Sequence, residues 1–118
     1  MSGILRSAKS EDIKIVLDAC RSRQALISRK QNKRTERLLQ QVWRTSFDRL
    51  QAAIVEHIEL RRKVFCKHGD DGVILDGCFE ANITIFDGLN VYVEIKIRQQ
   101  TIVILAAHSH YTASLLPQ

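Results

Sequence analysis

The stretch from Asn90 to Tyr111, NVYVEIKIRQQTIVILAAHSHY, constrains the fold more than any other part of this chain. Every second residue from Val91 to Ile97 is aliphatic, and the residues between them are polar or aromatic. This period of two predicts a strand with one buried face and one solvated face. Residues 101–107 are apolar at nearly every position and rich in β-branched side chains, which predicts a second strand that is covered on both faces or central in a sheet. The two strands are expected to form a hairpin.

Glycine residues divide the preceding part of the chain into strand-sized pieces. Residues 64–67 predict a first strand, and residues 73–86 predict either one strand broken at Asp76-Gly77 or two strands joined by a tight turn. Asp87-Gly88 comes directly before the alternating run, which is typical of a hairpin turn because glycine tolerates a positive φ. This part of the chain therefore predicts an antiparallel meander of about four strands.

The first half of the chain has helical periodicity instead. Ser10, followed by two acids, predicts a helix N-cap, and the apolar positions after it predict a helix to about Leu26. A basic segment without Gly or Pro follows, and a break near Asn32 is favoured because Ser and Asn side chains compete for backbone hydrogen bonds. Thr35 then caps or opens a second helix that runs to Lys63. This helix carries one apolar stripe along about five turns, formed by Leu39, Trp43, Phe47, Leu50, Ile54 and Ile58.

These elements predict a single α+β domain over residues 1–118, with a basic helical half, 1–63, and an antiparallel sheet of about four strands, 64–118. The two helices, of which the second is long, are expected to pack on one face of the sheet. The stripe around Trp43 would cover the aliphatic face that includes Val91. Apolar surface left over on so long a helix could instead serve a homodimer, which is an alternative hypothesis.

The composition is that of a soluble globular protein, because 45% hydrophobic and 26% charged residues argue against disorder. The longest apolar run, Ile102 to Ala107, is far shorter than the roughly 20 residues of a membrane span, and the N-terminus lacks the apolar core of a signal peptide. Three cysteines without a CxxC pair are expected to be free thiols. We therefore expect a cytoplasmic protein without a membrane partner.

The charge is divided unevenly along the chain. Residues 1–68 carry 16 Lys or Arg and 7 Asp or Glu, whereas residues 69–118 carry 2 and 6, within a net charge of +5. This asymmetry predicts an anionic partner for the first half, and nucleic acid is favoured over membrane. Seven cations with one acid among them predict contacts to the phosphate backbone without base specificity. The alternative is a basic surface that is solvated and binds no partner. The seven are Arg21, Arg23, Arg29, Lys30, Lys33, Arg34 and Arg37.

His108, His110 and Tyr111 follow the predicted central strand and form the candidate catalytic set. Two histidines at i and i+2 of an extended segment face the same way, so they could act as an acid/base pair or as metal ligands. Metal-free ribonuclease chemistry needs a base, an acid and cations that hold phosphate. The meander over residues 88–111 resembles the RelE and HigB toxin superfamily of small basic mRNA-cleaving enzymes, which implies a metal-independent ribonuclease. The opening strand of that superfamily is not evident here, and the second helix is long for it.

Two metal-site patterns are incomplete in this chain. Asp76 or Asp87, followed by the ExK motif that begins at Glu94, has the spacing of PD-(D/E)xK nucleases, in which two acids hold Mg²⁺. No helix follows that motif, however, as the nuclease fold requires. Cys66 and His68 are one close pair, whereas structural zinc sites usually have two. We therefore expect no metal and no bound cofactor.

The sequence thus favours a small basic protein that binds RNA or DNA through the phosphate backbone. The alternative is an interaction or adaptor protein that forms a homodimer or binds an acidic protein partner. A ribonuclease is the third possibility.

Overall fold

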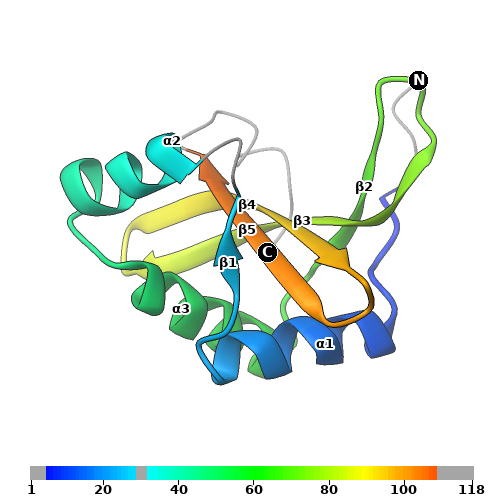
Figure 1. Cartoon of the computed structure of the whole chain (residues 1–118), viewed down its shortest axis with the longest axis horizontal. Coiled ribbons are helices and arrows are strands. Elements are labelled where there is room, and N and C mark those ends of the chain that lie inside the picture. Colours follow the sequence, from blue (N-terminus) through cyan, green and yellow to red (C-terminus); the bar gives the residue numbers. More distant parts are fainter. Residues whose placement is uncertain (1–4, 29–31, 109–118) are drawn as a thin grey trace.

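Five strands form one mixed sheet in the computed structural model of this chain, which describes residues 5–28 and 32–108 (Figure 1). The strand order across the sheet is β1-β5-β4-β3-β2. Strands β2 to β5 pair antiparallel with their neighbours, whereas β1 lies parallel to β5 at one edge. The strands are β1 Leu26–Ile27, β2 Phe65–His68, β3 Ile74–Phe86, β4 Leu89–Arg98 and β5 Ile102–His108.

The predicted alternation is confirmed in β4, where Val91, Val93 and Ile95 are buried. Val93 lies opposite Ala81 of β3 and Ala107 of β5, and both alanines are also buried. The aliphatic face of β4 therefore belongs to the core. The residues of β4 that alternate with these aliphatic residues face the other side of the sheet, because successive side chains of a strand point to opposite faces.

Helices α1 and α3 cover this aliphatic face, as the sequence predicts (Figure 1). Val16 of α1 and Leu50 and Ile54 of α3 belong to the same buried cluster as the aliphatic residues of β4. Within residues 5–28 and 32–108, no helix is long and apolar enough to cross a membrane. The helical segments are α1 Ser10–Arg21, α2 Asn32–Arg37, the π-helical turn η1 Leu38–Val42, and α3 Phe47–Glu59.

The first helix is shorter than predicted, because it ends at Arg21 and the chain then turns through Arg23, whose φ is 58°. Leu26–Ile27 form β1, which pairs in parallel with Ile104 and Leu105 of β5. The predicted antiparallel meander of about four strands is present as β2 to β5, but the sheet as a whole is mixed and has five strands, because β1 lies parallel to β5. The helical half, 1–63, contributes a strand to the sheet.

The prediction of one long second helix is also wrong. The chain breaks between η1 and α3, where Arg44 has a φ of 52° and the Ser46 side chain caps α3 by accepting a hydrogen bond from the N–H of Arg49 at 3.0 Å. The apolar stripe still faces the core, but two helical pieces share it. The long helix that the homodimer hypothesis required is absent from residues 32–108. Among the stripe residues, Leu39, Leu50 and Ile54 are buried, and Trp43, Phe47 and Ile58 are partly buried against the core.

Two glycines set the course of the long β3–β4 hairpin. Asp87-Gly88 forms the predicted turn, in which Gly88 has a φ of 82°. Gly77 does not divide the strand, because residues 74–86 are continuous through it at a φ of 70°. A Cβ atom at Gly77 would lie 2.9 Å from the backbone oxygen of Ile97, so this close approach of β3 to β4 requires glycine.

Candidate functional site

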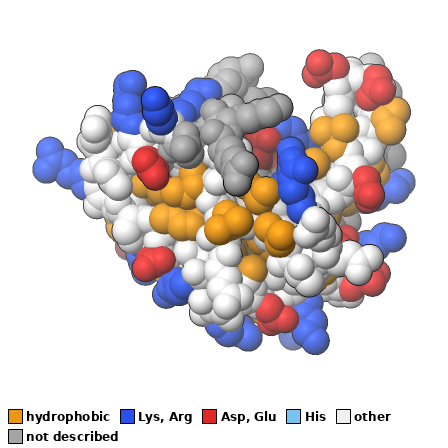
Figure 2. Space-filling model, in the orientation of Figure 1, with side chains coloured by type: hydrophobic (Ala, Val, Ile, Leu, Met, Phe, Trp, Pro, Cys, Tyr) orange, Lys and Arg blue, Asp and Glu red, His pale blue; other side chains and the backbone are white. Residues whose placement is uncertain are grey.

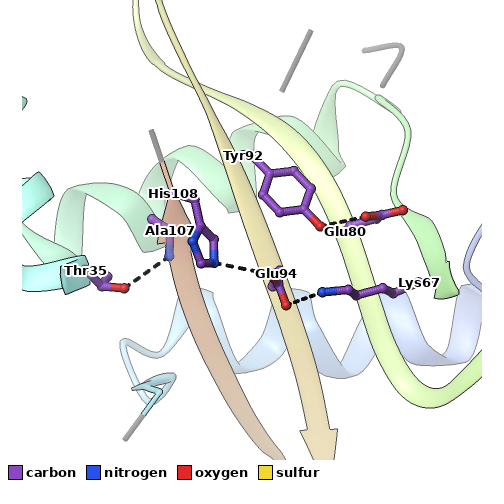
Figure 3. Close-up of polar contacts among 7 residues, drawn as sticks. All are labelled: Thr35, Lys67, Glu80, Tyr92, Glu94, Ala107 and His108. Atoms are coloured by element: carbon purple, nitrogen blue, oxygen red, sulfur yellow. Dashed lines mark hydrogen bonds and ion pairs between the residues drawn. The ribbon is translucent and has the colours of Figure 1, made fainter. Parts of the chain in front are cut away.

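Five polar side chains form a connected group on the sheet face opposite α1 and α3 (Figure 3). The strand register brings them together, because Glu80 pairs with Glu94 and Tyr92 pairs with His108 across neighbouring strands. Residues that lie directly opposite on antiparallel strands point to the same face. We call this group the sheet cluster; it consists of Lys67, Glu80, Tyr92, Glu94 and His108.

Glu94 is the centre of the sheet cluster. Its Oε2 lies 2.5 Å from Nζ of Lys67, and its Oε1 lies 3.2 Å from Nε2 of His108. The His108 side chain is 10% exposed, whereas that of Glu94 is 34% exposed, so the carboxylate reaches solvent and the imidazole lies beneath it. This contact is an ion pair only when His108 is protonated, so Glu94 favours the charged imidazolium over the neutral ring.

Tyr92, two residues before Glu94 on β4, also lies beside the imidazole. The ring centroids of Tyr92 and His108 are 5.8 Å apart, and the Tyr92 hydroxyl donates a hydrogen bond to Oε1 of Glu80 at 2.6 Å. Burial raises the pKa of Tyr92, and the hydrogen bond to Glu80 and the charge of Glu94 raise this pKa further. Tyr92 is therefore a hydroxyl donor at neutral pH and not a tyrosinate base.

The structure thus supplies partners for one member of the predicted catalytic set. His108 is the last residue of β5 and belongs to the sheet cluster, while His110 and Tyr111 lie outside the described residues. The sequence did not point to Lys67, Glu80 or Tyr92, and it pointed to Glu94 only as part of a nuclease-like metal motif. The alternation in β4 already placed Tyr92 and Glu94 on the solvated face, but only the register shows that Lys67 and Glu80 join them.

Three of the predicted nucleic-acid-binding residues, Lys33, Arg34 and Arg37, are exposed on α2 together with the acid Glu36. Figure 2 shows Lys and Arg side chains gathered at the end of the molecule where α2 lies. The carboxylates of the described residues form no ion pair with Arg34 or Arg37. These two guanidinium groups are therefore available to an external anion.

Helix α2 is attached to the sheet beside the sheet cluster. Thr35, which is fully buried, accepts a hydrogen bond with its Oγ1 from the N–H of Ala107 at 3.3 Å (Figure 3). Ala107 immediately precedes His108 in β5. The α2 cations and the imidazole of His108 are thereby held at the same end of one strand.

Two of the remaining predicted cations, Arg21 and Arg23, do not join this surface. Arg21 and Arg23 lie at the C-terminal end of α1, and Figure 1 shows that end and α2 on opposite ends of β1. Arg21 forms an ion pair with Glu59 at 2.9 Å, and Nη1 of Arg23 donates to the backbone oxygen of Cys20 at 3.2 Å. Arg29 and Lys30 lie outside the described residues. Further Lys and Arg side chains are spread along the opposite edge of the molecule in Figure 2.

The nuclease-like metal site does not assemble. Asp76 and Asp87 are four and seven residues from Glu80, the partner of Glu94 in β3, which separates them by roughly 13 and 23 Å along the strand direction. Across residues 5–28 and 32–108, no three His, Cys, Asp or Glu side chains are placed to share a metal ion. No family model matches the chain, and comparisons with curated proteins and with solved structures gave no match either.

Proposed function

We propose that this protein binds nucleic acid through the phosphate backbone and that the exposed cations of α2 are the contact surface. The observation that carries the proposal is the placement of Lys33, Arg34 and Arg37 on one short exposed helix that contains a single acid. Arg34 and Arg37 form no ion pair with a carboxylate of the described residues, and cations that are not neutralised attract phosphate most strongly. Arg29 and Lys30 precede α2 in the sequence and belong to the same predicted binding set, but they lie outside the described residues.

The attachment of α2 to the sheet supports the same proposal. The hydrogen bond from Ala107 to Thr35 attaches the helix to β5, so the backbone that carries the three cations is held against the sheet. A preformed cationic surface loses less conformational entropy on binding than cations on a loose segment do. Because the contacts are to phosphate, we expect little discrimination between base sequences.

The test is charge reversal of all three α2 cations together, Lys33→Glu, Arg34→Glu and Arg37→Glu. The matched control reverses three exposed cations elsewhere, Lys9, Lys14 and Arg61, and so changes the net charge equally.

Binding of a single-stranded RNA and of a duplex DNA is measured by fluorescence anisotropy between about 50 and 200 mM salt. The α2 variant is expected to lose affinity and to reduce the slope of log K against log salt by about 2 to 3, because each lost phosphate contact accounts for about 0.7 to 0.9 of that slope. The control variant is expected to keep most of the affinity and most of the salt dependence. Equal losses in the two variants would show that net charge, and not α2, determines the affinity.

A second candidate function, metal-independent RNA cleavage, is favoured by the 3.2 Å contact between Glu94 and His108. In this reaction His108 takes the proton of a ribose 2′-hydroxyl, whose oxygen attacks the neighbouring phosphorus; the P–O5′ bond breaks, and the 5′-oxygen leaves with a proton from water. The α2 cations hold the phosphate during this step. The test is cleavage of a labelled RNA in the presence of EDTA by the wild type, by His108→Ala and by Glu94→Gln. Cleavage that both substitutions remove, with RNA affinity retained, would establish this activity. Cleavage that survives His108→Ala would assign it to a contaminant or to other residues.

A further inference from the structure

A groove of about 320 Å³ lies between α3 and the end of β3, on a part of the molecule that neither α2 nor the sheet cluster uses. Its floor contains the buried residues Ala53 and Ile85. This volume is at the lower end of the range for small-molecule sites, which are typically several hundred Å³. The groove is lined by charged and polar side chains as well as apolar ones, so it can offer specific contacts as well as burial.

Two cations line the groove. Arg49 donates a hydrogen bond from Nη2 to the backbone oxygen of Ile85 at 2.8 Å, and its guanidinium lies 5.9 Å from the centre of the Phe86 ring. These contacts fix the guanidinium and leave its other N–H groups for an anion. Arg62, in the segment after α3, is exposed and supplies a second guanidinium.

His57 adds a buried hydrogen-bond acceptor to the wall of the groove. The residue is only 3% exposed, and its Nε2 donates to the backbone oxygen of Lys63 at 2.8 Å. Burial lowers the pKa of His57, and the charge of Arg62 lowers it as well, although the hydrogen bond to Lys63 opposes them. The neutral ring therefore presents Nδ1 as an acceptor, and no hydrogen-bond donor of the described residues reaches this buried atom. A buried polar atom without a partner calls for a ligand or a water that completes it.

The other lining residues define which ligand the groove can hold. Glu56 and Asp87 are carboxylates that can accept hydrogen bonds from a ligand, and their negative charge would repel a purely anionic one. Phe86 and Leu60 are large apolar side chains that are 41% and 56% exposed, and they offer a surface for a planar ring. The ligand must therefore combine an anionic group, several donors and a ring.

We propose that the groove binds a nucleotide, with its phosphate at Arg49 and Arg62, its base against Phe86, and its sugar or base donors at Glu56 and Asp87. The nucleotide can be free in solution or can be one unit of an RNA chain, because both present the same phosphate, sugar and base. This site is separate from α2, so it does not rest on the phosphate-backbone proposal.

The test is isothermal titration of the whole protein with adenosine monophosphate, adenosine and inorganic phosphate. Adenosine monophosphate is expected to bind at one saturable site, with adenosine and phosphate each at least about tenfold weaker, because either one alone leaves part of the groove unpaired. Arg62→Glu is expected to weaken the binding of adenosine monophosphate by at least about tenfold. Phe86→Ala, a change at an exposed side chain, is expected to weaken it by about threefold or more.

Two matched variants control for net charge. Arg61→Glu changes the charge equally at the neighbouring residue, which does not line the groove, and is expected to weaken binding less than about twofold. The α2 triple variant is expected to leave adenosine monophosphate binding unchanged, even where it removes RNA binding. The proposal is overturned by an absence of saturable binding, by equal effects of Arg61→Glu and Arg62→Glu, or by phosphate that binds as tightly as the nucleotide.

A competition titration then identifies the source of the nucleotide. If a short single-stranded oligoribonucleotide displaces adenosine monophosphate and is itself weakened by Arg62→Glu, the groove holds a unit of RNA. If the oligoribonucleotide does not compete, the groove holds a free nucleotide. Both results support a nucleotide site and assign its source.

Discussion

The hydroxyl of Thr35 accepts a hydrogen bond from the N–H of Ala107 at 3.3 Å, and this bond joins α2 to the end of β5. Thr35 is fully buried although its neighbours Arg34 and Glu36 are exposed. One face of this short helix is therefore attached to the sheet, and the opposite face presents its charges to solvent.

Replacement of Thr35 by Val is expected to lower the free energy of unfolding by about 1–3 kcal/mol, because the buried N–H of Ala107 loses its acceptor at nearly constant side-chain volume. Thr35→Ser keeps the hydroxyl and is expected to retain more of the stability. Urea unfolding followed by circular dichroism measures both. Equal stability of the Val and Ser variants would mean that the hydroxyl contributes little.

Gly77 and Gly88 both have a positive φ, but their surroundings differ. Gly77→Ala is expected to lower the free energy of unfolding by about 2–4 kcal/mol, because left-handed strain adds to a clash with the backbone of Ile97. Gly88→Ala meets open space and is expected to cost about 1–2 kcal/mol from strain alone. Thermal or urea unfolding of the two variants separates these contributions. If they were equally stable, the contact at Ile97 would not restrict residue 77.

The burial of His57 predicts a loss of stability in acid. The pKa of this histidine is lowered in the folded chain from its ordinary value of 6.5, so below about pH 6.5 the unfolded state binds a proton that the folded state does not. The free energy of unfolding therefore falls as the pH decreases from 6.5 toward the folded pKa. His57→Gln is expected to flatten this dependence between pH 7 and pH 5, as measured by urea unfolding at each pH. Parallel curves for the two proteins would exclude His57 as the cause.

The three cysteines are expected to differ in reactivity. Burial raises the pKa of the Cys20 thiol to about 12, an effect that the charge of Arg23 opposes only in part, whereas Cys78 is partly exposed. At pH 8 an aromatic disulfide reagent should label Cys78 first and Cys20 only when the protein unfolds, because the thiolate is the reactive form. Cys78→Ser should remove the fast phase of labelling. A fast phase that persists in this variant would place a reactive thiolate elsewhere.

Strands that are long enough to show an alternating pattern could be predicted from the sequence, whereas the shortest strand, β1, could not. Strand β4 is recognisable because its alternation continues over several residues, with its aliphatic side chains in the hydrophobic core. Leu26–Ile27 contain too few residues for any period, and they form a strand only because β5 offers a free edge beside them. The apolar stripe around Trp43 correctly predicted which side chains face the core. The stripe did not reveal the break before Ser46. Two consecutive helices that both face the core can show the same spacing of apolar residues as one long helix.

The candidate site could be predicted only in part for a similar reason. Position at the end of a strand identified His108, and exposure on the alternating strand identified Glu94 as solvated. Their contact depends on the pairing of β4 with β5, and the contact to Lys67 depends on β2, where the register shifts between Cys66 and His68. The register between neighbouring strands cannot be inferred from the spacing of residues within one segment of the sequence. The predicted basic residues lie in two places in the structure, at the end of α1 and on α2, because β1 separates these two segments.

The parallel pairing of Leu26 with Ile104 has a consequence for the order in which the protein is made. The ribosome releases β1 early, but its only sheet partner is synthesised after all the other described helices and strands. A nascent chain that stops before β5 keeps β1 without a sheet, and α2 without its attachment to Ala107. Closure of so large a loop is slow in comparison with the formation of local hairpins. The surface that carries the α2 cations is therefore completed only after translation has passed the last strand.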